Sequence, residues 1–425
     1  MGFTRDAVER LSALRDEPAW LKSRRLESFG VYERTPMPDT RRDADWRQVD
    51  LKGLDLESFE PFQQPDGAAP APSIPESLGV LAQRGTGAAT AASSAAELER
   101  RGVVFCPLWE AAVRHPELVE RYLFSALRPD RDKFSALHSA FFSGGTFLYV
   151  PDGVSLERPL VGQFWSAGTG GSTLPHTLIV AGKGSRFEYL DEFLSPSGDP
   201  ASIASGSSEI FLDDGAAVSY VALHRWGEQA WQFASQRVRL NRDAQFQGVN
   251  VGLGGRFARL RMEALLQGEG SSARLRGLFF GTGRQSFDFR TLQDHLAPHT
   301  TSDLLYKGAL RDLARSVYVG VVRVEKNARG TSANQANRNL LLSEKARAAS
   351  EPILEIENND ILRCSHGATV GPVDPEHLFY LTSRGIPEPV AERMLVQGFL
   401  SEVLDQIPVA YARQVVEEEL ARRIG

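Results

Sequence analysis

The feature that most constrains this chain is a series of short β-type segments between residues 146 and 364. Turn-forming breaks separate them, and these breaks recur about every 26 to 31 residues with no long helix between them. The segments are TFLYV, HTLIVA, RFEYL, EIFL, AVSYVAL, QRVRL, QFQGVNVGL, ARLRGLFF, SVYVGVVRV and ILEIENNDIL. The breaks are Asp152-Gly153, Gly182-Lys183-Gly184, Asp213-Asp214-Gly215, Asn241-Arg242-Asp243 and Gly268-Glu269-Gly270. A strand–turn unit that returns without helical crossovers predicts a solenoid or a sandwich.

Of these two architectures we favour a right-handed parallel β-helix. Small and amide residues crowd the stretch from Asn327 to Ser350, and such residues suit the tight, stacked turns of a β-helix. Helical periodicity takes over on both sides of the β region, in residues 5–35, 108–127 and 133–142 and again in 376–384, 387–407 and 411–424. The predicted fold is therefore mainly β with helical ends.

The expected organisation has three parts. Residues 1–145 form an N-terminal helical region with a flexible Ala/Pro/Gly/Ser-rich segment near 62–97, because such a segment buries too little apolar surface to offset its ordering entropy. Residues 146–364 form the β-helix core, and residues 365–425 form a C-terminal helical domain. Within the first part, Asp45-Trp46-Arg47 carries a large aromatic residue that we expect to fill a small satellite core.

An apolar stripe marks the longest C-terminal helix. Leu395, Phe399, Val403 and Ile407 recur every four residues, which places them on one face. Such a stripe either caps the open edge of a solenoid or docks a partner.

A cysteine and a histidine lie two residues apart where the β region ends. Residues two apart on an extended segment point to the same side, so Cys364 and His366 present a thiol and an imidazole together. Both groups are ligands for zinc, copper or iron–sulfur chemistry. Two donors are too few to hold a metal tightly, so the pair is either a structural turn or half of a shared site.

Composition and motifs exclude several functions. The 425 residues carry a net charge of −6 and no basic tract, which gives no indication of nucleic-acid binding. The two cysteines fit a reducing compartment, and the chain shows neither a secretory h-region nor a membrane-spanning run, so we expect a cytoplasmic protein. There is no Walker A loop, dinucleotide fingerprint or catalytic constellation. For the histidines of Asp294-His295-x-x-x-His299, turn packing is favoured over a loop metal site.

Several motifs resemble the SufB/SufD family of iron–sulfur cluster assembly scaffold subunits. These are CSHGATVG at 364–371, Leu378-Phe379-Tyr380-Leu381, Ser383-Arg384-Gly385-Ile386, Gln397-Gly398-Phe399, the 144–154 segment, Asp45-Trp46-Arg47 and Glu17-Pro18-Ala19-Trp20-Leu21. Within the family the chain is more similar to the SufD branch. SufB chains typically have glutamates around the histidine and a cysteine before the position of Leu340-Leu341, where this chain has Asn337-Arg338-Asn339.

The resemblance implies a scaffold subunit that is not an enzyme. It would pair with a SufB-like paralogue through the β-helices and dock a SufC-like ABC ATPase, which hydrolyses the ATP. His366, with Cys364 beside it, would form a half-site at the SufB interface for iron or a nascent iron–sulfur cluster. The implied docking residues are Leu378, Phe379, Arg384, Gly385, Leu395, Phe399 and Val403.

Further expectations and alternatives accompany this interpretation. The assembled complex would bind reduced flavin, to which no residue here is assigned, and the sequence leaves open whether the isolated chain forms a homodimer. A SufB-like paralogue is the alternative within the family. From other classes, a β-helix carbohydrate-active enzyme and a stand-alone metal-binding protein stay open; the former needs clustered carboxylates and normally export.

Overall fold

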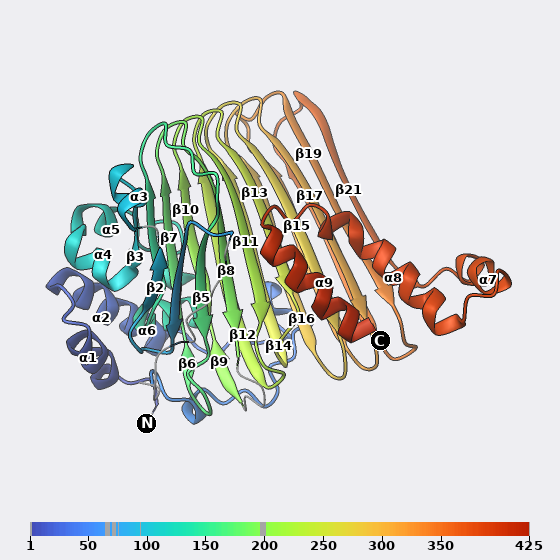
Figure 1. The fold of residues 1–425 in the computed structure, drawn as a ribbon, viewed down its shortest axis with the longest axis horizontal. Coiled ribbons are helices and arrows are strands. Elements are labelled where there is room, and N and C mark those ends of the chain that lie inside the picture. The colour runs from blue at the N-terminus through green and yellow to red at the C-terminus, as the bar shows by residue number, and fades with distance from the viewer. Residues whose placement is uncertain are drawn as a thin grey trace.

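The repeated strand–turn units build a parallel β-solenoid in a computed structural model that describes residues 2–63, 69, 74, 76–93, 95–195 and 201–424 (Figure 1). Two long sheets form its opposite walls, and successive strands in each sheet come from successive coils. The predicted parallel β-helix is thereby confirmed. Within each wall the strands of the solenoid pair in parallel and in register, as β15 and β17 do along their whole length.

The first wall is a ten-stranded sheet in the order β2-β1-β5-β8-β11-β13-β15-β17-β19-β21. Its strands are β1 (Gly79–Arg84), β2 (Thr90–Ser93), β5 (Leu160–Trp165), β8 (Arg186–Leu194), β11 (Ala217–Arg225), β13 (Gln245–Gly252), β15 (Ser272–Gly281), β17 (Thr301–Leu310), β19 (Thr331–Leu341) and β21 (Ile361–Pro372).

The second wall is an eleven-stranded sheet, ordered β20-β18-β16-β14-β12-β10-β7-β4-β3, with β6 and β9 alongside β12. Its strands are β3 (Val104–Pro107), β4 (Thr146–Val150), β6 (Ser172–Thr173), β7 (His176–Ala181), β9 (Ser202–Ala204), β10 (Ser207–Leu212), β12 (Ala230–Leu240), β14 (Phe257–Leu266), β16 (Ser286–His295), β18 (Arg315–Val324) and β20 (Arg347–Ile356).

The predicted breaks are the turns that stack from coil to coil. Gly215 has a φ of 69°, a left-handed conformation that glycine adopts without strain, and its N–H donates to the carbonyl of Arg242 in the next coil. Inside the solenoid, alternate side chains of both walls form one apolar core with aromatic residues such as Phe279, Phe289 and Tyr306. This alternation explains why period-2 patterning predicts the core correctly.

The N-terminal helices cover the outer face of the eleven-stranded sheet. The helical elements of this region are α1 (Arg5–Leu14), α2 (Ala19–Arg34), η1 (Ala44–Trp46), η2 (Leu56–Ser58), α3 (Ala95–Arg100), α4 (Leu108–Arg114), α5 (Pro116–Tyr122), η3 (Pro129–Arg131) and α6 (Lys133–Phe141). Trp46 is buried there beside Phe134 and Phe233, so it fills a satellite core as expected.

The region before residue 146 also contains strands that the sequence pattern does not reveal. β1 and β2 lie within the segment expected to be flexible, and β1 pairs with β5 of the solenoid. The remainder of that expectation falls partly on residues 64–68, 70–73, 75 and 94, which lie outside the described residues.

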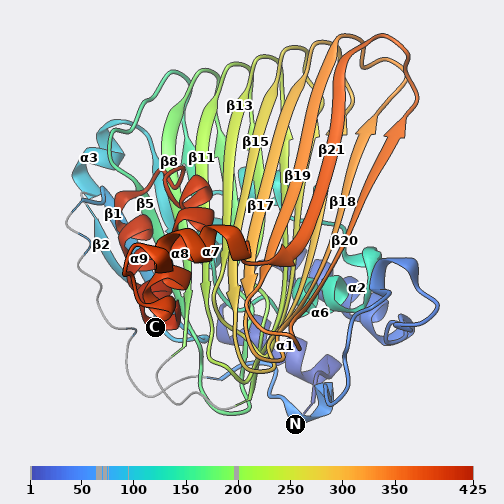
Figure 2. The ribbon, with the colours of Figure 1, turned by 90° about the vertical axis from the view of Figure 1, so that its right-hand side faces the viewer.

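The C-terminal helices lie on the opposite wall. α8 (Glu388–Leu404) and α9 (Ala410–Ile424) pack on the outer face of the ten-stranded sheet, while α7 (Pro375–Ser383) projects away from it (Figures 1 and 2). The two helical regions therefore cover opposite faces of the solenoid (Figure 2). None of the helices in the described ranges is long and apolar enough to cross a membrane.

The two ends of the solenoid differ. At the first end, β2 and β3 pair antiparallel to β1 and β4 and are the last strands of their sheets, and α3 and α4 pack against β3. At the other end, β20 and β21 are the last strands of their sheets, and no strand among the described residues pairs with their outer edges. This second end is open.

Candidate functional site

The predicted thiol–imidazole pair lies on β21, at the open end. Cys364 is opposite Ala333 of β19 and His366 is opposite Gln335, and both of these β19 residues are buried inside the solenoid. Parallel in-register strands keep facing residues on the same side of the sheet, so Cys364 and His366 share the interior face of the last coil. The juxtaposition expected from their spacing is therefore present.

Cys364 is half-buried. It packs against a small apolar cluster that includes Val322, Val324, Ala333 and Leu354. Burial raises the pKa of its thiol, because removal from water disfavours the thiolate. The thiol is therefore protonated at neutral pH until a cation binds beside it.

His366 is exposed on the same strand. Between the two residues, Ser365 points the other way and donates to the side-chain oxygen of Asn334 at 2.9 Å, and Asn334 in turn donates to Asp303. This outward polar ladder fixes the register of β21 on β19 and thereby fixes which face carries the thiol and imidazole.

The open end also exposes apolar side chains. Leu362, at the start of β21, is 78% exposed, and Val370, Ile353 and Ile356 are exposed as well. Across the described ranges, no cluster of three or more His, Cys, Asp and Glu side chains is placed to hold a metal ion. Cys364 and His366 supply two donors, whereas a stable tetrahedral site needs four.

The predicted docking residues divide into two groups. Val403 is fully buried between α8 and the ten-stranded sheet, together with Val396 and Leu400, so its side chain faces the solenoid and not a partner. Phe399 is partly buried, and its backbone carbonyl and ring both contact Lys307 of β17. The apolar stripe therefore holds the helix on its own sheet.

The other predicted docking residues lie further out. Phe379 is 72% exposed on α7, Arg384 and Gly385 are exposed in the turn after it, and Leu378 and Leu395 are partly buried. Tyr380 and Met394 extend the apolar surface but are absent from the predicted set. No side chain of α7 is buried.

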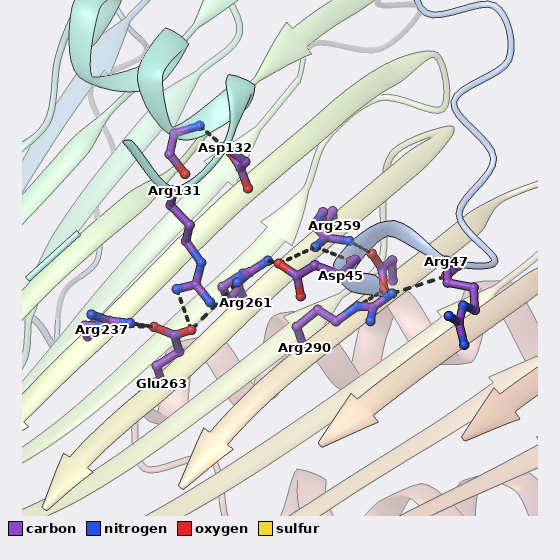
Figure 3. A network of polar contacts seen from close by, with 11 residues as sticks. Asp45, Arg47, Arg131, Asp132, Arg237, Arg259, Arg261, Glu263 and Arg290 are labelled. Atoms are coloured by element: carbon purple, nitrogen blue, oxygen red, sulfur yellow. Dashed lines mark hydrogen bonds and ion pairs between the residues drawn. The ribbon is translucent and has the colours of Figure 1, made fainter. Parts of the chain in front are cut away.

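A second polar site lies on the outer face of the eleven-stranded sheet, and sequence patterns do not reveal it (Figure 3). Its centre is Glu263 of β14, which accepts from the guanidinium groups of Arg131 and Arg237 at 2.6 Å each. Although burial raises the pKa of Glu263, these two arginines together with Arg261 hold it below its usual value. The carboxylate is therefore ionised.

Asp45 of the N-terminal region also takes part in this network. Arg261 donates to the carboxylate of Asp45 at 2.6 Å, and Arg259 donates to the Asp45 backbone carbonyl at 2.8 Å. Arg259 also pairs with Asp288, which accepts from Arg290 at 2.7 Å. Burial lowers the pKa of Arg259 to about 10, with the neighbouring arginines adding to the effect. These contacts fix Asp45-Trp46-Arg47 on the sheet.

A cavity of about 270 Å³ lies between η3, α6 and the strands β12 and β14. The reduced flavin implied by the resemblance stays a prediction, to which no residue is assigned.

The histidines of the 294–299 segment lie in different surroundings. His295, the last residue of β16, is buried in the solenoid, where its ring nitrogens lie 2.7 Å from the hydroxyls of Thr300 and Ser302, and burial lowers its pKa to about 4. His299 lies in a turn against Gly330. The expected turn packing therefore describes His299, whereas His295 packs inside the solenoid.

Fold and site together define a β-solenoid protein with helices on both outer walls and a thiol–imidazole pair on its last strand. Residues 164–399 match the family model of the SUF system FeS cluster assembly, SufBD core domain, and residues 87–161 match that of the SufBD protein N-terminal region. The chain belongs to the SufBD family, and its role is in iron–sulfur cluster assembly.

Relatives are similar over the whole chain. The iron–sulfur cluster assembly protein SufD of Bacillus subtilis is 29% identical, covering 100% of this chain and 98% of its own length. An iron–sulfur cluster assembly SufBD family protein of Staphylococcus saprophyticus is 28% identical over 100% of this chain and 94% of its own. The resemblance stated from the motifs is confirmed, and it argues against a carbohydrate-active enzyme.

Proposed function

We propose that this chain is a non-catalytic, cytoplasmic scaffold subunit that shares a transient iron or iron–sulfur cluster site with a SufB-like paralogue and docks a SufC-like ATPase. The observation that carries the proposal is the position of Cys364 and His366. They share one face of β21, the last strand of its sheet, whose outer edge no described strand pairs with. A partner solenoid at that end would bring the missing donors.

The chemistry of the pair suits temporary binding. Thiolate and imidazole both ligate iron, and a bound cation favours the thiolate over the thiol. Because burial raises the pKa of Cys364, iron binding must displace a proton, and loss of iron returns the thiol to its stable protonated form. Such a site binds weakly without its partner's ligands and releases its cargo readily.

Docking of the ATPase is proposed for α7 and the turn that follows it. Phe379 with its exposed neighbours Tyr380 and Met394 offers an apolar surface, and Arg384 lies 4.7 Å from the Tyr380 ring and supplies a charge. Because α8 is held on the solenoid, force applied to α7 would reach the ten-stranded sheet through α8. Val403 is left out of this surface because it is buried.

The test is iron retention by the chain reconstituted with a SufB-like paralogue and a SufC-like ATPase. His366→Ala should lower the iron or cluster bound per complex at least tenfold, and Cys364→Ser should lower it less. Thr369→Ala is the matched control, since its exposed side chain lies on the opposite face of the same strand. Equal iron retention by His366→Ala and the control would refute the half-site.

A further inference from the structure

The cavity beside the arginine network has walls of two chemical kinds. One wall is aromatic: Phe134 and Phe233 stack with ring centroids 3.7 Å apart and planes 10° apart, and Trp46 lies 5.2 Å from Phe134. All three side chains are buried, so the wall is an apolar surface held by packing from α6, β12 and η1. Aromatic and apolar walls are typical of sites that bind small organic ligands.

The other wall is cationic. Arg131, Arg237, Arg259 and Arg261 all line the cavity. Arg259 and Arg261 are almost completely buried, and Arg131 keeps 32% of its side chain exposed. The structure thus places guanidinium groups, which bind carboxylate and phosphate oxygens, beside an aromatic surface.

The guanidinium groups of the network share a smaller number of carboxylates. Including Arg290, the network contains five arginines and four acids. The acids are Asp45, Asp132, Glu263 and Asp288. Asp132 accepts from a backbone N–H as the N-cap of α6. Each of the others is shared, as Glu263 is between Arg131 and Arg237. Arg131 is the least buried of these arginines, and only its Nη1 pairs with Glu263, so its other N–H groups are accessible to a ligand.

Fastening of the N-terminal region explains only part of this arrangement. The bonds from Arg259 and Arg261 to Asp45 join that region to the sheet. They account neither for the accessible N–H groups of Arg131 nor for a cavity left between the aromatic and cationic walls. An anion inside the cavity would accept hydrogen bonds from those groups.

We propose that this cavity binds a small organic anion that combines one flat ring with a single carboxylate or phosphate group. The ring packs against the aromatic wall, and the anion binds Arg131. This ligand site is separate from the open end of the solenoid and does not depend on the proposed scaffold role.

The first experiment measures binding of phenyl phosphate and of benzoate to the full chain by calorimetry at fixed ionic strength. Inorganic phosphate, which lacks the ring, and benzyl alcohol, which lacks the charge, are the comparison ligands. We expect one of the two aromatic anions to bind at least tenfold more tightly than either comparison ligand, and the better one identifies the anionic group. Equal binding of inorganic phosphate, or no binding of either aromatic anion, overturns the proposal.

Variants then locate the site. Arg131→Gln should weaken binding at least tenfold, and Glu263 keeps Arg237 as its partner in this variant. Ser235→Leu fills the cavity without changing an arginine and should abolish binding, which keeps the test decisive where Arg131→Gln fails to fold. The matched control is Arg121→Gln, because Arg121 is exposed on α5 and does not line the cavity. Unchanged affinity in Ser235→Leu overturns the proposal.

Discussion

The two cysteines differ in the environment that controls their ionisation. Cys364 is half-buried at the open end, and burial raises the pKa of its thiol. Cys106 on β3 is packed more deeply near Glu110, and burial raises its pKa from 9.0 to about 12. Only a thiolate attacks an alkylating reagent or binds iron, so reactivity reports which cysteine can serve as a ligand.

We therefore predict that iodoacetamide at pH 8 modifies Cys364 well before Cys106. A pKa of about 12 leaves Cys106 roughly a thousandfold less thiolate than an unperturbed thiol. Peptide mapping by mass spectrometry over time gives the two rates in one sample, and Cys364→Ser identifies the faster signal. Equal rates for the two cysteines would contradict the higher thiol pKa that burial gives Cys106.

A buried carboxylate inside the solenoid sets a pH dependence of stability. Asp191 accepts hydrogen bonds from Thr177 and Tyr189 on one oxygen and from Tyr220 and Ser208 on the other. Burial still raises its pKa from 3.8 to about 6. Because the folded-state pKa is the higher one, the folded protein binds the proton more tightly than the unfolded chain.

The stabilisation from protonated Asp191 should be fully present below about pH 4 and lost as the pH rises through about 6. At about 1.4 kcal/mol per pKa unit, the change is on the order of 3 kcal/mol. Asp191→Asn should remove this part of the pH dependence. Urea unfolding of both proteins between pH 4 and 7 measures it, and parallel curves would show that Asp191 does not titrate in this range.

At the scale of elements, local pattern predicts some features well. Cys364 and His366 share a face because strand period is a local property, and the predicted C-terminal helices agree with α7, α8 and α9 to within a few residues. β14 is different: FARLRMEALL is rich in good helix formers, yet it is a strand because β12 and β16 pair with it on both sides. Tertiary pairing decides its conformation.

The features that the sequence does not predict depend on contacts between residues far apart in the chain. Asp45 and Arg261 form their bond across 216 residues, and nothing in the local pattern of either segment indicates the other. The orientation of α8 is a similar case. A wide apolar stripe predicts that a face is covered, but only the structure shows that Val403 faces the chain's own sheet.

α7 is the element whose exposure calls for a partner. We predict that Phe379→Ser lowers co-purification of the SufC-like ATPase at least tenfold while stability stays within about 0.5 kcal/mol, since an exposed side chain contributes little to folding. Val113→Ser, an exposed apolar residue on α4, is the matched control. Loss of binding in both variants, or in neither, would remove α7 from the docking surface.

At the scale of the whole molecule, the asymmetry of the solenoid is the main constraint. One end finishes in the antiparallel strands β2 and β3, with α3 and α4 packed against β3. The other ends in β20 and β21, with exposed apolar side chains beside backbone groups that no described strand pairs. Proteins normally cover or charge such edges, because they otherwise pair with other chains. In this chain the same end carries Cys364 and His366, so whatever covers the edge also completes the thiol–imidazole pair.

This arrangement predicts that the isolated chain self-associates through the open end and that a SufB-like paralogue displaces the second copy. Leu362→Lys places a charge on the edge and should weaken self-association at least tenfold in sedimentation experiments across a concentration series. Val113→Lys adds the same charge on α4 and should leave association unchanged. If Leu362→Lys weakened pairing with the paralogue as well, one edge would serve both partners, and iron retention should fall in parallel. Unaltered association in Leu362→Lys would mean that the subunits meet elsewhere and that Cys364 and His366 face no partner.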